Sequence, residues 1–395
     1  MVGNIEIVTP NHGLILDTFI MYGFIRAISE GEGGSDRLER TVVKPEGEYY
    51  SIEVSEEDIQ EIEVRFYDSL YEAFKSDVSL ARSGRSWRLG ALFQNEEKTL
   101  DDLENFLEGL REASRDILKI FDLFRATSTW EEWRSYRCGL HIKILKRSLK
   151  VKSLVKDYTV QISLSPQLGK YLYNYDEGVY PRQQKVCPLC ASLSILGLLS
   201  HSVRMVLREG GKTSGWQFVV MIPTTNVLAQ KISLFREAFG KTGKLIMPLS
   251  LNKMPEVMTP LLLFKGMETS SLKDLLQTKP TLFAYRFEPS PGKPGVMAVR
   301  KTSEYPASRF IEFYLKVRER ASNVDMKLLN YMEKDRYFPF FSELALSIMT
   351  RDPERFYKFL RGLSAEIIKE EKGKERAFFS EAFVKQALRF YGKRR

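Results

Sequence analysis

Two cysteines at close spacing are the sharpest chemical feature of this sequence. Cys187 and Cys190 stand in a Cys-Pro-Leu-Cys string, and that spacing lets one turn of chain present both sulfurs to a single metal ion. Cys138 and His141 repeat the spacing upstream. The four side chains would supply three thiolates and one imidazole, a ligand set typical of closed structural zinc sites. We therefore predict a structural zinc ion held by Cys138, His141, Cys187 and Cys190.

Other interpretations of the cysteines stay open at this point. His201 is an alternative fourth ligand, although it lies well along the helix expected after Cys190. Three cysteines make no disulfide framework, which fits a reducing, cytoplasmic setting. The thiols are alternatively small buried side chains without a ligand, or Cys187 and Cys190 form a disulfide. Thioredoxin-like redox chemistry is disfavoured, because no strand-helix-strand pattern precedes the motif.

The other reactive residue types argue against catalysis. Gly211-Lys212-Thr213 and Gly240-Lys241-Thr242 resemble the end of a phosphate-binding loop, but Val206 and Phe235 stand where that loop needs its first glycine. The three histidines are scattered along the chain, so they predict no histidine-based nuclease. The sequence therefore predicts a protein that is not an enzyme.

Charge is unevenly distributed along the chain. Residues 1–133 contain 28 of the 51 acidic residues but only 14 of the 60 Lys and Arg residues. The remaining two thirds are strongly basic, which favours a nucleic acid as partner, and the acidic third is available to protein partners or solvent. Sparse Asn and Gln beside abundant Lys and Glu are typical of a thermophile.

Two basic clusters are the candidate phosphate contacts. The first surrounds a turn between two strands expected in 141–164, where Lys146, Lys150 and Lys152 would share one face of an extended chain. The second is a hairpin expected over 281–301, whose Pro- and Gly-rich tip would present Lys293 to a groove. The predicted nucleic-acid contacts are Lys143, Lys146, Arg147, Lys150, Lys152, Lys156, Lys293, Arg300 and Lys301.

Hydrophobic periodicity predicts an α+β fold in three domains. We expect an acidic mixed α/β domain with ferredoxin-like elements over 1–133, a basic strand-containing domain with the Cys-Pro-Leu-Cys element over 134–301, and a helical bundle over 302–395. The first domain is expected to contain a strand at 4–9, a helix at 14–29 and strands at 40–54 and 61–67. The apolar stretch 191–207 contains His201 and Arg204 and is short for a membrane span, so it predicts a buried helix.

Three parts of the sequence resemble the large subunit of archaeal type I-A CRISPR effector (Cascade) complexes. They are VTPNHGLILDTFIMYGFIRAIS near the N-terminus, CPLCASLSILGLLSHS in mid-chain, and the helical C-terminal region. The resemblance implies a non-catalytic protein that contacts guide RNA and target DNA beside other CRISPR effector subunits. It also implies recognition of a motif flanking the target, help with strand separation, and recruitment of a helicase–nuclease. A zinc-stapled RNA-binding scaffold and a metal-dependent nucleic-acid enzyme are the alternatives.

Overall fold

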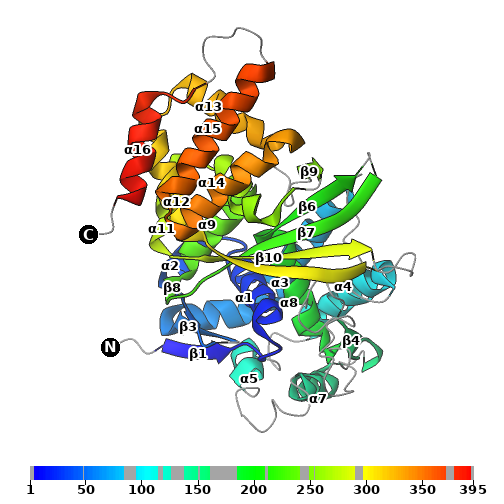
Figure 1. Ribbon diagram of the computed structural model, residues 1–395. Coiled ribbons are helices and arrows are strands. Elements are labelled where there is room, and N and C mark those ends of the chain that lie inside the picture. The colour runs from blue at the N-terminus through cyan, green and yellow to red at the C-terminus, as the bar shows by residue number, and fades with distance from the viewer. Residues whose placement is uncertain are drawn as a thin grey trace. The chain divides into compact units, whose positions relative to one another are not determined.

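A computed structural model gives the fold, and it confirms the predicted α+β class. The described residues are 4–47, 49–83, 95–113, 119–125, 138–149, 152–160, 185–209, 212–240, 249–252, 254–289, 297–370 and 378–392. The chain forms two compact units (Figure 1). The first comprises Met1–Val203, Pro223–Met247 and Ser290–Arg300, and the second comprises Arg204–Ile222, Pro248–Pro289 and Lys301–Arg395. The three domains predicted over 1–133, 134–301 and 302–395 were defined by charge and element type along the sequence, and they stay a prediction.

The first unit contains a four-stranded antiparallel sheet in the order β1-β3-β2-β8. β1 and β3 pair with Asn4 opposite Ser55 and Val8 opposite Ser51. The strands of this unit are β1 (Asn4–Val8), β2 (Val42–Pro45), β3 (Tyr50–Ser55), β8 (Val227–Leu228) and a separate pair, β4 (Tyr158–Thr159) and β5 (Lys185–Val186). Its helices are α1 (Leu14–Ile28), α2 (Gly34–Arg40), α3 (Glu56–Ser83), α4 (Glu96–Ala113), α5 (Ile120–Arg125), α7 (Gly139–Ser148), α8 (Pro188–His201) and α9 (Ala229–Gly240).

Helices α1 and α8 form the centre of the first unit. Every residue of α8 is buried, as is every residue of α1 from Ile15 onward, because both sequences are apolar around the whole helix. Two glycines permit their close approach. A Cβ atom on Gly23 would lie 2.0 Å from the carbonyl oxygen of Leu193, and one on Gly197 would lie 1.9 Å from that of Phe19. The two backbones therefore touch where they cross.

The second unit combines a five-stranded sheet with the C-terminal helices. The sheet has the order β11-β10-β7-β6-β9, with β7 and β10 antiparallel and β6 and β9 parallel. Its strands are β6 (Ser202–Glu209), β7 (Lys212–Ile222), β9 (Leu249–Asn252), β10 (Thr281–Pro289) and β11 (Met297–Pro306), of which Ser202–Val203 and Met297–Arg300 are counted with the first unit. Its helices are α10 (Thr259–Lys265), α11 (Thr269–Gln277), α12 (Ala307–Arg318), α13 (Asn323–Asn330), α14 (Phe338–Thr350), α15 (Pro353–Glu370) and α16 (Glu381–Tyr391). The helices from α12 to α16 match the predicted helical C-terminal region.

A buried carboxylate joins the beginnings of α13 and α16. Asp325 accepts hydrogen bonds from the backbone N–H of Ser322 and of Ser380, at 2.7 Å each, and from both serine hydroxyls. Ser322 and Ser380 in turn cap α13 and α16. One side chain thus fixes where two helices start.

Three predicted elements are wrong in detail. Residues 61–67 belong to the long helix α3, and the predicted strand beginning at His141 is helix α7. The buried helix expected over 191–207 ends at His201, and Ser202 begins strand β6. The alternation of Ile62, Val64 and Phe66 resembled a strand, yet Val64 is 47% exposed while the other two face the helical core.

Candidate metal centre

Two of the four predicted ligands lie at the beginning of α8. Cys187 is the N-cap residue, and its Sγ accepts a hydrogen bond from the backbone N–H of Cys190 at 3.3 Å. Pro188 occupies the first helical position, where a residue without an N–H is best tolerated. The N-cap residue and the third helical residue lie on one side of the helix. Both sulfurs therefore face the same point.

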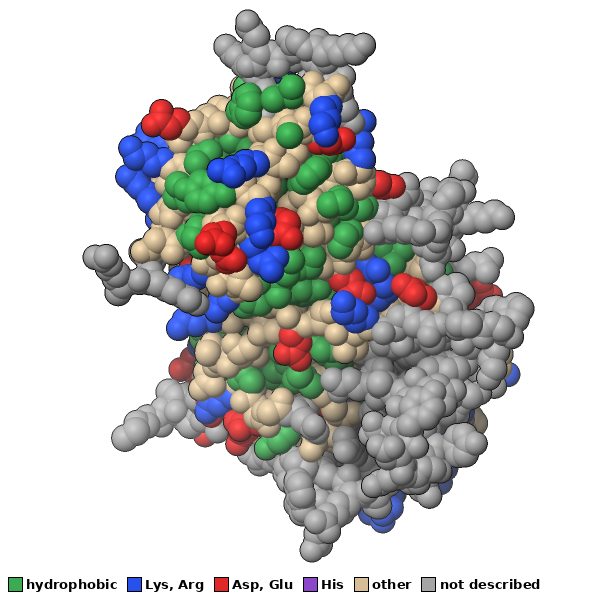
Figure 2. All heavy atoms as spheres, in the orientation of Figure 1, with side chains coloured by type: hydrophobic (Ala, Val, Ile, Leu, Met, Phe, Trp, Pro, Cys, Tyr) green, Lys and Arg blue, Asp and Glu red, His purple; other side chains and the backbone are tan. Residues whose placement is uncertain are grey.

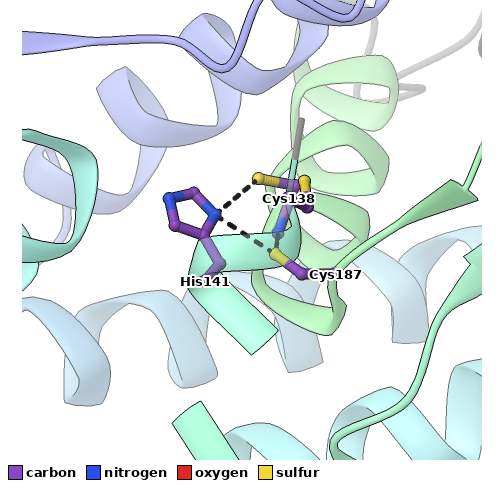
Figure 3. A group of neighbouring side chains, drawn as sticks. Cys138, His141 and Cys187 are labelled. Carbon is purple, nitrogen blue, oxygen red and sulfur yellow. Dashed lines mark hydrogen bonds between the residues drawn. The ribbon is translucent and has the colours of Figure 1, made fainter. Parts of the chain in front are cut away.

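The other two ligands lie at the beginning of α7. Cys138 directly precedes the helix and His141 lies in its first turn. Both side chains are fully buried, as are Cys187 and Cys190. The ligand atoms of all four residues lie within 4.8 Å of one another. Cys138, His141 and Cys187 converge from the ends of the two helices, as Figure 3 shows.

The spacing of these atoms fits a tetrahedral metal ion. The Nδ1 atom of His141 lies 3.4 Å from the Sγ of Cys187 and 3.5 Å from the Sγ of Cys190. Metal bonds of about 2.3 Å to sulfur and about 2.05 Å to nitrogen would hold the two atoms about 3.5 Å apart across a tetrahedral angle. His141 Nε2 is buried without a hydrogen-bond partner among the described residues. Nδ1 is the nitrogen available to a metal, because it is the one that faces the cysteine sulfurs.

The electrostatics of the three thiols are unequal. Burial raises the pKa of the Cys138 and Cys190 thiols above the usual range of cysteine. Burial also acts to raise the pKa of Cys187, but hydrogen bonds from the Cys138 and Cys190 thiols and the neighbouring His141 hold that pKa well below its usual value. These hydrogen bonds favour the thiolate of Cys187, the form that a metal requires.

The alternative ligand His201 lies outside this group. Its ring stacks on Tyr22, with 4.3 Å between the centroids, and its Nδ1 atom lies 2.6 Å from the Ser200 hydroxyl. Burial, assisted by the charges of Arg236 and Arg26, lowers its pKa well below the usual histidine value. His201 is a neutral core residue. The three cysteines are unpaired thiols, not a disulfide.

The structure brings part of the first predicted basic cluster together. Lys143, Lys146 and Arg147 are exposed on α7 and have no carboxylate partner among the described residues. They share a face because residues three and four apart are neighbours on a helix. The opposite face buries His141, Ile142 and Leu145. The cluster thus exists on a helix, not on the predicted strand.

The other predicted basic residues are placed differently. Lys152 is exposed in a short 3₁₀ helix, whereas Lys156 pairs with Asp102 at 2.6 Å. Lys301, in the second unit, pairs with Glu256 at 2.9 Å. Lys150, Lys293 and the side chain of Arg300 lie outside the described residues.

Several cations of the second unit are paired with neighbouring acids. Lys265 pairs with Glu333, and Arg355 pairs with Glu343 at 3.0 Å. Figure 2 shows the same mixture on one face of the molecule, where Lys and Arg side chains lie beside Asp and Glu and between hydrophobic ones. The basic surplus of the sequence therefore does not form one continuous surface over the part of the second unit seen there. The cluster of Lys143, Lys146 and Arg147 on α7 is therefore the stronger candidate for a phosphate-binding surface.

One contact at the metal centre was not predicted. The Nε2 atom of His12 lies 2.8 Å from the Sγ of Cys138, across 126 residues of sequence. The only signal in the sequence is a histidine in the Pro-Asn-His-Gly turn before an apolar helix.

No helix in the described part of the chain combines the length and apolar character that a bilayer crossing requires.

Comparison with known proteins relates the chain to a protein family and to a curated relative. A family model described as CRISPR-associated protein (Cas_Csa4) matches residues 5–374. The CRISPR system associated protein Cas8 of Thermoproteus tenax is 27% identical over 217 residues, which is 53% of this chain and 55% of that protein. The chain thus aligns with about half the length of this curated relative.

Proposed function

Because the chain belongs to the CRISPR-associated Cas_Csa4 family, we propose that it serves as the Cas8-like large subunit of an RNA-guided type I-A effector complex. In this role it binds target DNA beside the guide RNA and the other effector subunits, without cleaving it. Base pairing with the guide selects the sequence, so the protein has to hold backbone and recognise a short flanking duplex. We further propose that it recruits the helicase–nuclease that degrades the target.

The observation that supports nucleic-acid contact best is the exposed face of α7. Lys143, Lys146 and Arg147 gather there without carboxylate partners among the described residues. Unpaired cations on one helix face can each neutralise a phosphate and release its counterions. The cations of Lys156 and Lys301 already face a carboxylate, so their contribution to DNA contact would be smaller.

Duplex binding tests this proposal directly. The variant Lys143→Ala, Lys146→Ala, Arg147→Ala should bind weakly, and the slope of log affinity against log salt should fall by about 2 to 3 units, near 0.9 for each lost phosphate contact. A matched control removes three cations that are already paired with acids in the same unit. These pairs are Lys44 with Glu53, Arg65 with Glu61 and Lys119 with Glu63.

Both variants lose the same net charge, so a general charge effect would weaken both equally. Equal weakening, or an unchanged slope in the α7 variant, would refute a DNA contact at α7. Purified protein incubated with divalent metal and single- or double-stranded DNA tests the enzymatic alternative. Turnover in that assay would overturn the non-catalytic role.

We also propose that Cys138, His141, Cys187 and Cys190 hold a structural zinc ion. The support is the donor set, its complete burial and sulfur-to-nitrogen distances that suit tetrahedral coordination. The ion would tie the start of α7 to the start of α8. Since α7 otherwise buries only Ile142 and Leu145, the metal would fix the helix that carries the basic cluster.

Metal analysis of the purified chain tests the zinc site. The wild-type protein should contain about one zinc ion per chain, and Cys187→Ser should lose most of it because an alcohol is a poor zinc ligand. The control is Ala365→Ser, which introduces a serine on the exposed face of α15 and leaves the four ligands unchanged. A fully stable wild-type protein without metal would refute the zinc site and leave the DNA-binding proposal standing.

A further inference from the structure

His12 reaches the metal centre from a distant part of the chain. It lies in the turn between β1 and α1, its side chain is buried, and its Nε2 atom is 2.8 Å from the Sγ of Cys138. Both residues belong to the first unit. The role of this histidine is not explained by the four-residue ligand group, which does not include it.

The turn that carries His12 is fixed by the first turn of α1. The Asp17 carboxylate accepts hydrogen bonds from the backbone N–H of Asn11, at 2.9 Å, and of His12. Asn11 and Gly13 on either side adopt positive φ angles of 57° and 107°. Such angles suit asparagine and glycine. The backbone of His12 is therefore held in place independently of its ring.

The distance to Cys138 distinguishes a hydrogen bond from direct coordination. A sulfur and a nitrogen that share one tetrahedral zinc ion lie about 3.5 Å apart, as His141 does from two of the cysteines. The His12 nitrogen is much nearer to its sulfur. It is placed to donate a hydrogen bond to that sulfur, with His141 remaining the imidazole ligand.

We propose that His12 donates an Nε2–H···Sγ hydrogen bond to the zinc-bound thiolate of Cys138 and so acts as a positioning residue for the metal. This inference rests on the proposed zinc site. Three thiolates and a neutral imidazole leave a zinc centre with one excess negative charge, and a buried charge is costly unless it is hydrogen-bonded. The His12 donor offsets that charge and ties the turn before α1 to the metal. Outer partners of this kind change metal affinity about 10–100-fold.

Three replacements of His12 separate the hydrogen bond from packing. His12→Phe keeps a ring of similar size without a donor, His12→Ala removes the ring, and His12→Gln keeps an N–H donor. Zinc release to an excess of a chromophoric chelator should be about 10–100-fold faster in the Phe and Ala variants than in wild type. It should be largely restored in the Gln variant. Thermal unfolding with saturating zinc checks that each variant is folded.

The absorption spectrum of the Co²⁺-loaded protein responds to the hydrogen bond itself and does not change if His12 only fills space. In the Co²⁺-loaded protein, losing a hydrogen bond to one thiolate makes that sulfur a better electron donor. The sulfur-to-cobalt charge-transfer band should therefore move to lower energy in the Phe variant, with the d–d bands still tetrahedral. If wild type and His12→Phe release zinc at the same rate with identical cobalt spectra, the role of His12 is refuted although the zinc site stands. If wild type binds neither ion, the zinc site itself fails, and the His12 role with it.

Discussion

Replacing Gly23 by alanine tests whether the contact between α1 and α8 is as close as the structure has it. The new methyl group would lie 2.0 Å from the carbonyl oxygen of Leu193 and 2.6 Å from its carbon. Carbon-to-oxygen contacts between helices need about 3.3 Å, so the helices must move apart by roughly 1.3 Å. The obstacle is backbone, so no side-chain rotation can relieve it.

The cost follows from two opposing contributions. Overpacking in a well-packed core costs about 1–3 kcal/mol, and a backbone obstacle places this site at the upper end of that range. Alanine regains about 1 kcal/mol of helix propensity over glycine. We expect Gly23→Ala to lower the free energy of unfolding of the first unit by about 2 kcal/mol.

Chemical denaturation followed by far-UV circular dichroism measures the change. Gly266→Ala is the matched control, because a Cβ atom there has no neighbour within 4 Å and the residue has an ordinary φ of −79°. An unfolding midpoint in Gly23→Ala that equals or exceeds that of the control would show that the two helices are not in backbone contact at this point.

Three further outcomes follow from contacts described above. Removing zinc with a chelator should lower the affinity for duplex DNA about as far as the triple α7 variant does, since two of the proposed ligands lie at the start of that helix. Fluorescence anisotropy before and after chelation measures this affinity. Undiminished binding would show that the metal does not hold α7 in its DNA-binding position. Acid should weaken the second unit. Burial acts to raise the pKa of Asp325, but hydrogen bonds from Ser322 and Ser380 outweigh it and hold that pKa below its usual value. The stabilisation that Asp325 provides is therefore complete above about pH 4, the usual aspartate range, and is lost as the pH falls through the lowered pKa. Asp325→Asn should remove this part of the pH dependence of unfolding in a circular-dichroism titration. An unaltered titration would show that Asp325 does not contribute in this way. Combining Gly23→Ala with Gly197→Ala should cost less than the two single changes together, because both act at one crossing; strict additivity in denaturation would argue for separate sites.

Within the candidate site, the sequence predicts best the grouping of Cys138, His141, Cys187 and Cys190. Paired residues at Cys-x-x-Cys spacing must lie close together, so each half of the site was implied by local geometry. Only the fold brings the halves together, and His12 joins them through a turn that carries no recognisable motif. The positions of Cys138 and Cys187 relative to one another depend on how the starts of α7 and α8 meet, which no local rule gives.

The errors in secondary structure have a common cause. Alternating apolar residues predict strands, but Ile142, Leu145 and Leu149 also recur at helical spacing. These three apolar residues are the ones that α7 and its C-terminal end bury. Short segments support both interpretations until burial decides between them. The end of α8 at His201 had no glycine or proline to mark it, so the buried helix was predicted too long.

The glycine contact between α1 and α8 was not visible in the sequence. Glycine inside a helix usually lowers helix stability, so Gly23 and Gly197 gave no reason to expect tight packing. Their value becomes clear only when the two helices are placed against each other. Composition does not reveal which cations have acidic neighbours: in the second unit Lys265, Arg286, Lys301, Arg351 and Arg355 each lie beside a carboxylate.

The long separation between the partners at the metal centre constrains how the protein assembles. His12 meets Cys138 across 126 residues, and His141 meets Cys187 across 46. On a chain emerging from the ribosome, the four ligands of the proposed zinc site cannot come together until α8 has been synthesised. If zinc binds there and helps to join these distant segments, recombinant yield should rise when the growth medium is supplemented with zinc.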